Sequence, residues 1–456
     1  MPLTAITSYL LLTVISLIQA LATWIYLRSF RQREPTGRGS ETWPRTAVIL
    51  SLRGDDPQLA DSLDRLAALD YPGYELHIIV DHETDPAAEA VAAWQRSREV
   101  RRSFVPVSVQ VLRDISLNAY LKTSAVRQCL LAIADRFEAA VIVDADTRVY
   151  PGWLRDMVRP LLDSKVGLVT GNRWYDPATP GWGSMVRFIY NANAVMPMHF
   201  MRATWGGSMA IRRGVFQAAG FAARMSRTSC EDAALQDLTR QAGLKIRFQS
   251  NAMMWNDDPI SLPACFRFMR RQLLWTRLYH PGWSGILCGT SVNYGLLAGA
   301  TIGACVGAAS GDWISTVLHA AGVGTFALVN WLLIERLHVE IGRRIRDVQG
   351  IECPAMTAST RIRLLAALSV ALVAHTLATV AAAMAQTVRW RGITYQVVPP
   401  DGLRLMTYVP YRFSLQLEAT PPTRQRNGAA EYLPGSISVR AESADAAAMQ
   451  PRVEAA

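Results

Sequence analysis

Several signatures of metal-binding and disulfide-bonded proteins are missing from this sequence of 456 residues. Its six cysteines are scattered, with no Cys-x-x-Cys pair and no histidine cluster at zinc-ligand spacing. We therefore expect reduced thiols on the cytosolic side or inside a membrane. Charge is also scarce, since 18% of the residues are charged whereas 50% are hydrophobic. This balance is apolar for a soluble enzyme of such length and points towards a bilayer.

The start of the chain lacks charged residues altogether. The run from Leu3 to Leu27 contains none, and at about 1.5 Å per residue it can cross a hydrocarbon core of about 30 Å. Because Met1 to Tyr9 has no Lys or Arg, unlike a cleaved signal peptide, we predict a transmembrane anchor over residues 1–30. Four arginines follow the run: Arg28, Arg31, Arg33 and Arg38. The positive-inside rule then places the domain behind them in the cytoplasm.

Three further apolar runs predict a transmembrane region over residues 285–387. They cover roughly Gly285–Ala309, Trp313–Ile334 and Leu364–Gln386. The first two are so close that we expect a tight hairpin, and the arginine-rich loop after them again marks the cytoplasmic side. A crossing by the third run would put three arginines outside, which leaves a re-entrant or interfacial segment as the alternative. These arginines are Arg389, Arg391 and Arg404.

The last part of the chain, residues 388–456, is expected to hold a short folded element and a tail. Beyond about Pro421 the sequence shows Gly, Ser, Ala, Pro and Gln with mixed charge and no sustained periodicity. Such composition is typical of a disordered segment, and we assign no chemistry to it.

Residues 44–260 alternate strand and helix signals. Strands are predicted for four apolar, β-branched runs, Thr46–Leu52, Leu76–Val80, Ala139–Val143 and Val166–Thr170. Leucines at helical spacing separate the first two runs, and a second helix is expected from about Thr123 to Phe137. Runs without alternation are typical of strands buried on both faces of a parallel sheet. The pattern therefore predicts a doubly wound α/β domain.

Acidic residues directly follow two of these strands, Asp81 after one and Asp144 and Asp146 after another. In open parallel sheets ligands bind at the carboxyl ends of the strands, which makes these residues candidates. The Asp-x-Asp pair offers two carboxylates that could share a divalent cation with diphosphate oxygens and neutralise a leaving group. Such a pair also occurs in solvated loops, and its place after a buried strand is what favours the functional interpretation.

A second acidic pair, Glu231 and Asp232, precedes a helical stretch from Ala233 to Ala242. Carboxylates in a first turn are favoured by the helix dipole, which is the structural explanation. The functional one is that a carboxylate takes the proton from an acceptor hydroxyl as it attacks an anomeric carbon. The spacing does not choose between the two residues.

Residues 261–284 combine arginines and aromatic residues just before a membrane run. An interfacial amphipathic helix with snorkelling arginines explains this pattern. The same helix could also turn a guanidinium group and an indole towards a bound diphosphate. The net charge of +10 fits anionic lipid or a phosphate-bearing substrate. Because the basic residues gather beside membrane runs, we expect no nucleic-acid partner.

Taken in order, these elements resemble the ceramide glucosyltransferase family, within the family-two inverting glycosyltransferases, over about Leu3 to Tyr395. Four motifs carry the resemblance: VDHETDP (80–86), VDADT (143–147), CEDAALQDLTRQAGLKIRF (230–248) and RRQLLW (270–275). The last is similar to a (Q/R)xxRW signature. RWRGITYQV (389–397) also matches a family element, without an assigned role. The resemblance implies a nucleotide-sugar-binding, GT-A-like α/β domain with transmembrane helices at both ends.

By this resemblance, Asp232 would be the general base and Asp146 would bind Mg²⁺ or Mn²⁺. The UDP-sugar donor would be bound by Asp81 at the uracil, Asp144 at the nucleotide sugar, Arg271 and Trp275 at the diphosphate, and Lys122 nearby. The acceptor pocket would be lined by Trp205, Gly206 and Gly207.

Some of these assignments have plain alternatives. Lys122 could be a surface lysine, and the two glycines could form a simple turn into a strand. The sequence also departs from the family at Leu274, where an arginine is expected before the tryptophan. Arg270 and Arg277 are the cations that could compensate.

The apolar runs and their arginine-rich flanks predict a multi-pass membrane protein with a cytoplasmic catalytic domain, and the resemblance implies that it is an enzyme. It would transfer a hexose, with glucose as the expected sugar, from a UDP-sugar to the hydroxyl of ceramide, diacylglycerol or a hopanoid-like lipid, with inversion. One rival is a processive polysaccharide synthase, which shares the aspartates but needs a channel for its polymer. Another is a catalytically silent membrane scaffold, against which the intact aspartates speak. The oligomeric state is not predicted.

Overall fold

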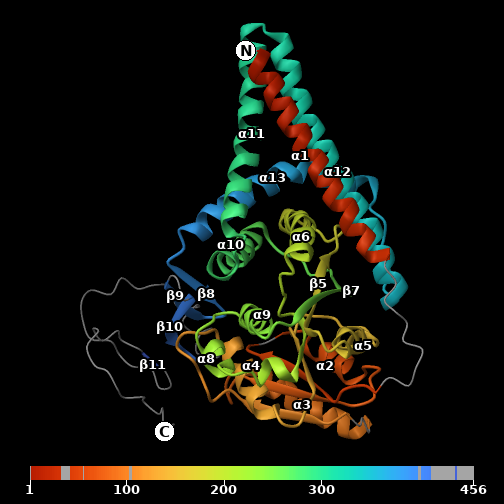
Figure 1. Cartoon of the computed structure of the whole chain (residues 1–456), viewed down its shortest axis with the longest axis vertical. Helices are drawn as coiled ribbons and strands as arrows, with labels where there is room; N and C mark the ends of the chain where they lie inside the picture. Colours follow the sequence, from red (N-terminus) through yellow and green to blue (C-terminus); the bar gives the residue numbers. More distant parts are fainter. Residues whose placement is uncertain are drawn as a thin grey trace.

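The computed structural model describes residues 2–31, 42–54, 56–101, 105–398, 402–411 and 437–438. In this part of the chain a tower of three long helices projects from a globular body, and the N-terminus lies at the far end of the tower (Figure 1). Apart from residues 437–438, the predicted disordered tail lies outside the described residues, as do Arg33 and Arg38 of the basic flank.

The body is built on a sheet of seven strands in the order β3-β2-β1-β4-β6-β5-β7. The strands are β1 Thr46–Leu52, β2 Tyr74–Val80, β3 Val107–Val111, β4 Ala139–Val143, β5 Val166–Tyr175, β6 Ser208–Arg212 and β7 Lys245–Asn256. The first four are parallel, β6 is antiparallel to β4 and β5, and β7 is parallel to β5. All four predicted strands are present, although β5 continues past Thr170. The α/β prediction is confirmed, with a sheet that is mixed because β6 is reversed.

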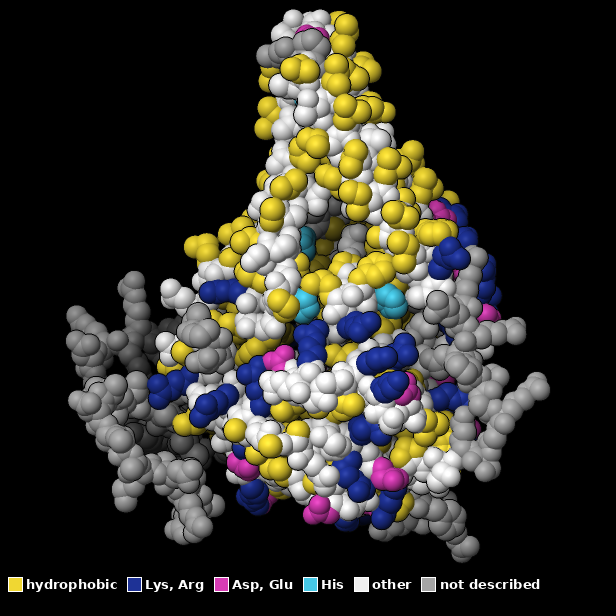
Figure 2. Space-filling view, in the orientation of Figure 1, with side chains coloured by type: hydrophobic (Ala, Val, Ile, Leu, Met, Phe, Trp, Pro, Cys, Tyr) yellow, Lys and Arg dark blue, Asp and Glu magenta, His cyan; other side chains and the backbone are white. Residues whose placement is uncertain are grey.

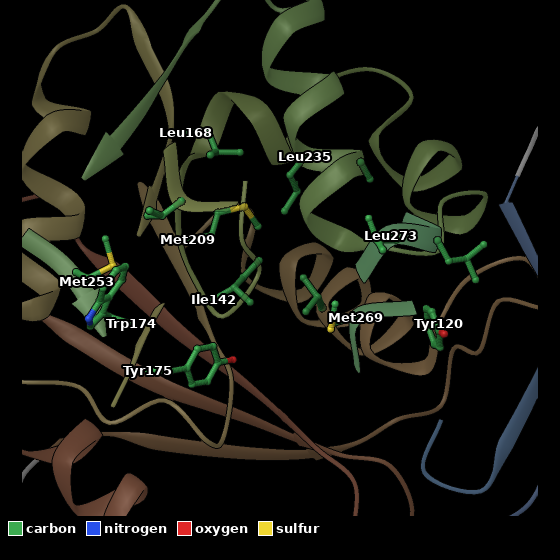
Figure 3. Close-up of a cluster of buried hydrophobic side chains, with 14 of the residues drawn as sticks. Tyr120, Ile142, Leu168, Trp174, Tyr175, Met209, Leu235, Met253, Met269 and Leu273 are labelled. Atoms are coloured by element: carbon green, nitrogen blue, oxygen red, sulfur yellow. The ribbon is translucent and has the colours of Figure 1, made fainter. Parts of the chain in front are cut away.

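Alternate residues of β1 face two separate cores, because this strand is covered on both faces. Ala47 and Ile49 belong to the first core, and Val48 and Leu50 belong to the second. Figure 3 shows part of the first core. Its helices are α4 Leu121–Ile133, α6 Trp182–Met201, α9 Glu231–Gln241 and α10 Leu262–Tyr279. The second core packs under α2 Leu59–Ala67, α3 Pro86–Arg101 and α5 Trp153–Val158. Shorter elements are a 3₁₀ turn at Arg159–Leu162, α7 Arg213–Phe216 and α8 Phe221–Ser226.

The tower consists of α1 (Pro2–Arg31), α11 (Trp283–Ser310) and α12 (Trp313–Gln349). The predicted hairpin between α11 and α12 is closed by Gly311, with φ at 74°, and the Asp312 side chain caps α12 by accepting from the Ser315 amide at 3.1 Å. Apolar side chains cover the outside of the tower (Figure 2). Together with α13 (Ala358–Ala383), these are the helices in the described chain that are long and apolar enough to span a bilayer. The chain is therefore a membrane protein.

Helix α13 lies across the base of the tower, against α6 and α10 (Figure 1). Near its start Arg363 donates to the Thr179 carbonyl oxygen at 3.2 Å, and at its end Arg277 of α10 donates to the Ala382 carbonyl oxygen at 2.9 Å. Both ends are therefore attached to the body. Its buried stripe begins with Thr360 and Leu364 and continues mainly with small residues, namely Ala367, Ala371, Ala374, Ala378 and Ala382. Large apolar residues are exposed on it, including Ile362, Leu365, Leu377 and Met384.

A small antiparallel sheet in the order β11-β10-β9-β8 follows α13. Its strands are β8 Thr387–Trp390, β9 Ile393–Val398, β10 Gly402–Tyr408 and β11 Ile437–Ser438. The RWRGITYQV segment forms the β8–β9 hairpin, whose turn places Arg391 at φ 43° and Gly392 at φ 79°. The hairpin returns to the body, because Arg53, just after β1, donates through Nε to the Arg391 carbonyl oxygen at 3.1 Å. The C-terminal element thus lies on the same side as the catalytic candidates.

Candidate active site

One cavity of about 1380 Å³ connects the carboxyl ends of the strands with the base of the tower. It brings together eight of the residues singled out in the sequence, namely Asp81, Lys122, Asp144, Asp146, Trp205, Asp232, Arg271 and Trp275. Gly206 and Gly207 lie directly behind them, at the start of β6. Residues far apart in the chain meet here because β2, β4 and the first turns of α4 and α9 all end or begin at this edge of the sheet.

Lys122 bridges two of the carboxylates. Its Nζ lies 2.6 Å from Asp144 Oδ1 and 2.5 Å from Glu231 Oε1, and the side chain is 21% exposed. Burial alone would lower the pKa of Lys122, but these two carboxylates raise it, so the lysine is held as a cation. Lys122 is therefore part of the site rather than a surface lysine, and Glu231 is held by an ion pair.

The second aspartate of the Asp-x-Asp pair is held by Arg173, which the sequence reasoning did not single out. Arg173 Nη2 lies 2.9 Å from Asp146 Oδ1 and Nη1 lies 3.1 Å from Oδ2, an arrangement of two parallel hydrogen bonds. Burial favours the neutral form of Asp146, yet Arg173 keeps the pKa of Asp146 lowered. The arginine guanidinium also lies 4.9 Å from the ring centre of Trp205. Asp146 is therefore an ionised carboxylate with a strong counter-ion.

Asp232 differs from the other carboxylates because it has no side-chain cation bonded to it in the described part of the chain. Its Oδ1 accepts from its neighbour's amide, Ala233 N, at 2.7 Å, and its Oδ2 accepts from Gly206 N at 3.3 Å. Burial and the nearby Glu231 raise the pKa of Asp232 to about 7, although Lys122 and these two amides oppose the shift. Asp232 is therefore a carboxylate that exchanges a proton near neutral pH.

Glycine is required beside these carboxylates for reasons of space. A Cβ on Gly206 would collide with the Glu231 carboxylate, and one on Gly207 would lie 2.8 Å from Asp144 Oδ2. The glycines are thus more than a turn into β6, since they let the backbone approach the acidic cluster. The same approach places the Gly206 amide against Asp232.

Asp81, which follows β2, is more deeply buried than the other aspartates of the cavity. It forms an ion pair with Arg53, and Tyr408 of β10 donates to Asp81 Oδ2 at 3.4 Å. Its Oδ1 is buried without a hydrogen-bond partner in the described chain. Burial raises the pKa of Asp81, and Arg53 opposes this rise. The carboxylate therefore retains one acceptor position, at the edge of the cavity.

The C-terminal element supports this corner of the site, a role that the sequence motif alone did not reveal. Arg53 donates through Nη2 to the Val409 carbonyl oxygen at 2.8 Å, and Arg391 donates to the Arg53 carbonyl oxygen. Arg391 also lines the cavity. Arg53 and Arg173 had no signal that local sequence could supply, because each acts on a residue distant in the chain, whereas Arg391 lies in the RWRGITYQV motif, to which the sequence alone assigned no role.

Helix α10 carries the (Q/R)xxRW-like box along the cavity. Arg271 lines the cavity, and its guanidinium has no hydrogen-bond or ion-pair partner among the described residues. Burial lowers the pKa of Arg271, and the nearby charge of Asp144 opposes this only in part. Trp275 packs edge-on against Tyr120, with ring centres 4.8 Å apart. The helix thus presents an unpaired cation and an indole to the same space.

Leu274, which replaces the family's arginine, is buried in the first core. Of the two cations that were expected to compensate, Arg270 donates to the Thr387 carbonyl oxygen at 3.1 Å and Arg277 donates to the Ala382 carbonyl oxygen. Neither belongs to the cavity lining. That expectation was wrong, because both arginines hold the end of α13 and the start of β8. Arg173 and Arg391 are the additional arginines that line the cavity.

The cavity continues from the acidic cluster towards the membrane helices. Residues 189–191 and 193–194 of α6 line its middle, and α1, α11, α12 and α13 line its upper part. Figure 2 shows a hollow between the apolar tower and the body. The same cavity thus connects the acidic cluster with helices that are long and apolar enough to span a membrane.

Residues 8–401 match the model of the family described as Glycosyl transferase family 21. Among solved structures, a mannosyltransferase from Pyrobaculum calidifontis in complex with GDP-Man and Mn²⁺ is similar, with 15% identity, a TM-score of 0.45, and coverage of 83% of this chain and 97% of that chain. A glucosyl-3-phosphoglycerate synthase from Mycobacterium tuberculosis, in complex with Mn²⁺, UDP and glucosyl-3-phosphoglycerate, has 16% identity and a TM-score of 0.34, with coverage of 50% of this chain and 79% of that chain.

The family match confirms the resemblance read from the four motifs, and the mixed sheet with flanking apolar helices fits the GT-A-like domain that the resemblance implied. Because the match spans most of the sequence, the chain belongs to glycosyl transferase family 21, the ceramide glucosyltransferase-like family, and is a glycosyltransferase.

Proposed function

We propose that this glycosyltransferase moves a hexose, with glucose as the expected sugar, from UDP to the hydroxyl of a membrane lipid, with inversion at the anomeric carbon. The supporting observation is the continuity of the cavity between the acidic cluster and the tower. A soluble acceptor would need no path between membrane helices. Ceramide, diacylglycerol and a hopanoid-like lipid remain the candidate acceptors.

In this proposal Asp232 is the general base. It takes the proton of the lipid hydroxyl while that oxygen forms a bond to the anomeric carbon, and the bond from this carbon to the β-phosphate oxygen of UDP breaks. A pKa raised to about 7 suits this task, because the carboxylate is substantially ionised at neutral pH yet basic enough to accept a proton. The two backbone amides that it accepts from hold the carboxylate in place.

The donor would occupy the region between Asp81 and α10. The free acceptor oxygen of Asp81 suits an N–H group of the base, and the unpaired Arg271 suits the diphosphate, with Trp275 beside it. Lys122 and Asp144 lie between these two ends, where the sugar and the β-phosphate would sit. Trp205, Gly206 and Gly207 would border the acceptor.

The residues present fit a divalent cation that binds together with the donor. Asp144 and Asp146 supply hard oxygen ligands, and the described chain has no group of three or more His, Cys, Asp and Glu placed to hold a metal by itself. Mg²⁺ and Mn²⁺ sites at nucleotides commonly use one or two carboxylates and complete the shell with phosphate oxygens and water. When bound, such an ion neutralises charge on the leaving diphosphate.

The body would lie at the cytoplasmic face, with α1, α11 and α12 as the spans. The attachment of both ends of α13 to the body supports a position along the membrane surface, so in this proposal α13 does not cross the bilayer. Its exposed apolar residues would instead face the lipid at the membrane surface. This arrangement keeps Arg391 on the cytoplasmic side.

The proposal is tested with the purified full chain in nanodiscs, supplied with radiolabelled UDP-sugars and extracted membrane lipids. The expected product is a single lipid-soluble labelled spot on chromatography, with a β-linkage from an α-linked donor. EDTA should abolish its formation and Mg²⁺ or Mn²⁺ should restore it. A water-soluble labelled polymer would favour the polysaccharide synthase, and UDP binding without any transfer would favour the scaffold.

A further inference from the structure

A small pocket lies between α1 and α12 on the outside of the tower. Its volume is about 160 Å³, and because one water molecule needs only about 10–15 Å³ of such volume, a phosphate group can enter it. The pocket is lined by Ala20, Thr23, Trp24, Leu27, Arg28, Leu333 and Arg336. Both helices run from the far end of the tower towards the body, so the pocket is apolar towards the far end and basic towards the body.

The pocket lies where the apolar surface of the tower ends. Large exposed apolar side chains precede its two arginines along both helices, namely Leu17, Ile18, Leu21 and Ile25 on α1 and Leu328 and Leu332 on α12. Figure 2 shows basic side chains gathered at the base of the tower, below this apolar surface. Trp24, which is 54% exposed, lies at the same level. Tryptophan and arginine at the end of an apolar span are typical of the headgroup region of a bilayer.

Arg28 carries the charge that α1 contributes to the pocket. Its guanidinium carbon lies 4.6 Å from the ring centre of Trp24, and it has no hydrogen bond or ion pair within the described part of the chain. Stacking on an indole holds the guanidinium plane in place and leaves the N–H groups at its edge free to donate. Arg28 is therefore a positioned cation without a counter-ion.

The arginine that α12 contributes is only partly neutralised. Arg336 Nη2 lies 2.6 Å from Glu340 Oε1, but Arg343 Nη1 lies 3.2 Å from Oε2 of the same carboxylate. The neighbouring Glu335 is used by Arg361 of α13, at 2.6 Å. Together with the unpaired arginine of α1, four arginines here meet two carboxylates. A surplus of positive charge thus surrounds the pocket.

We propose that this pocket is a binding site for an anionic phospholipid. Arg28 and Arg336 contact the phosphate, and the acyl chains follow the apolar side of the pocket, beside Ala20 and Leu27, towards the far end of the tower. A zwitterionic phospholipid fits less well, because its own cation would add to the surplus positive charge. The site needs neither donor nor acceptor, so it goes beyond the proposed transfer and does not depend on it.

The pocket shares a wall with the active-site cavity. Thr23 and Leu333 line both spaces, and Thr23 donates to the sulfur of Met196 in α6 at 3.1 Å. A lipid bound outside therefore packs against the helices that enclose the cavity and bridges α1 with α12. Because it binds the folded protein, it should raise the melting temperature.

The test measures lipid binding to the purified full chain in detergent. Phosphatidylglycerol is titrated against the wild type, Arg28→Gln and Arg336→Gln, with native mass spectrometry to count bound lipids and a thermal melt at each lipid concentration. The wild type should retain one phosphatidylglycerol most tightly, with an affinity that falls as salt is added. Each variant should weaken this binding roughly fivefold, as expected for one arginine near a membrane surface, and should lose most of the thermal stabilisation.

Arg343→Gln is the matched control. Arg343 is on the same helix as Arg336 and pairs with the same Glu340, but it does not border the pocket. The variant removes an equal charge and should bind phosphatidylglycerol as the wild type does. Melting temperatures without lipid show whether all variants are folded.

Three results would overturn the inference. Equal loss of binding in Arg343→Gln would show a diffuse attraction to the basic surface. Equally tight retention of phosphatidylcholine would show that the negative charge is not recognised, and displacement of phosphatidylglycerol by inorganic phosphate would identify a site for a free anion. None of these results bears on sugar transfer, because the experiment contains neither donor nor acceptor.

Discussion

Arg173 holds both carboxylate oxygens of Asp146, with its two terminal nitrogens 2.9 and 3.1 Å away. The aspartate expected to bind a divalent ion is therefore already neutralised by a residue of the chain. A cation that approaches Asp146 competes with the guanidinium, and the guanidinium it displaces stays in the cavity, where a diphosphate would meet it. In the proposed function, Arg173 would therefore couple the binding of the metal ion to the binding of the donor.

Arg173→Gln should strengthen the binding of Mn²⁺ to the donor-free protein about tenfold, because it removes a competitor worth about 1.4 kcal/mol. Electron paramagnetic resonance titration of Mn²⁺ measures this without turnover. Arg155→Gln is the control, since Arg155 pairs with Asp70 on the surface of the body at 3.0 Å. Unchanged or weaker Mn²⁺ binding in the Arg173 variant would contradict the competition.

Asp232→Asn should lower kcat roughly 10²- to 10⁴-fold while the Kd for UDP changes little, because the amide cannot accept the proton of the acceptor. Single-turnover transfer and calorimetric binding of UDP separate the two effects. Asp237→Asn, on the same helix but paired with Arg224, should keep normal turnover. Wild-type activity in the Asp232 variant would show that Asp232 is not the general base.

The value of kcat/KM should rise with pH, and the midpoint of this rise should lie near pH 7. The base works in its ionised form, and burial together with Glu231 raises the pKa of Asp232 to about 7, so protonation below that pH removes the base. Glu231→Gln deletes the neighbouring negative charge and should move the limb of kcat/KM to lower pH. If the limb stays in place in this variant, Asp232 is not the group that titrates.

Gly206→Ala should reduce turnover at least tenfold with the fold retained. The added Cβ would push aside the Glu231 carboxylate. Lys122 would move with it, because this lysine forms ion pairs with both Glu231 and Asp144. Gly214→Ala is the matched control, because a Cβ at Gly214 meets nothing within 4 Å. Transfer rates and melting temperatures are measured for both. Equal activity of the two variants would show that close packing at Gly206 is dispensable.

The two ends of the chain should lie on opposite sides of the membrane if, as proposed, α1, α11 and α12 cross the bilayer and α13, attached to the body at both ends, does not. Protease-sensitive tags before Met1 and after Ala456 test this in sealed inverted vesicles, where only the C-terminal tag should be cleaved. Cleavage of both tags or of neither would mean that α13 crosses as well.

The sequence was sufficient for the elements whose cause is local. Buried strands such as Thr46–Leu52 and spans such as Leu3–Leu27 appear as unbroken apolar runs, and a hairpin needs only Gly311 between two such runs. The reversed strand β6 gave no such signal, because strand direction depends on partners distant in the chain. The same holds for α13, whose composition equals that of a span although both of its ends attach to the body.

The acidic residues of the site could be named from their motifs, because each stands at the end of a strand or the start of a helix. Their partners could not. Arg53 and Arg173 look like any other arginine in the chain, and their effect on charge and pKa exists only where folding brings them against Asp81 and Asp146. Ionisation depends on distances and burial, which are properties of the folded chain, whereas motif and hydropathy are properties of the residue order.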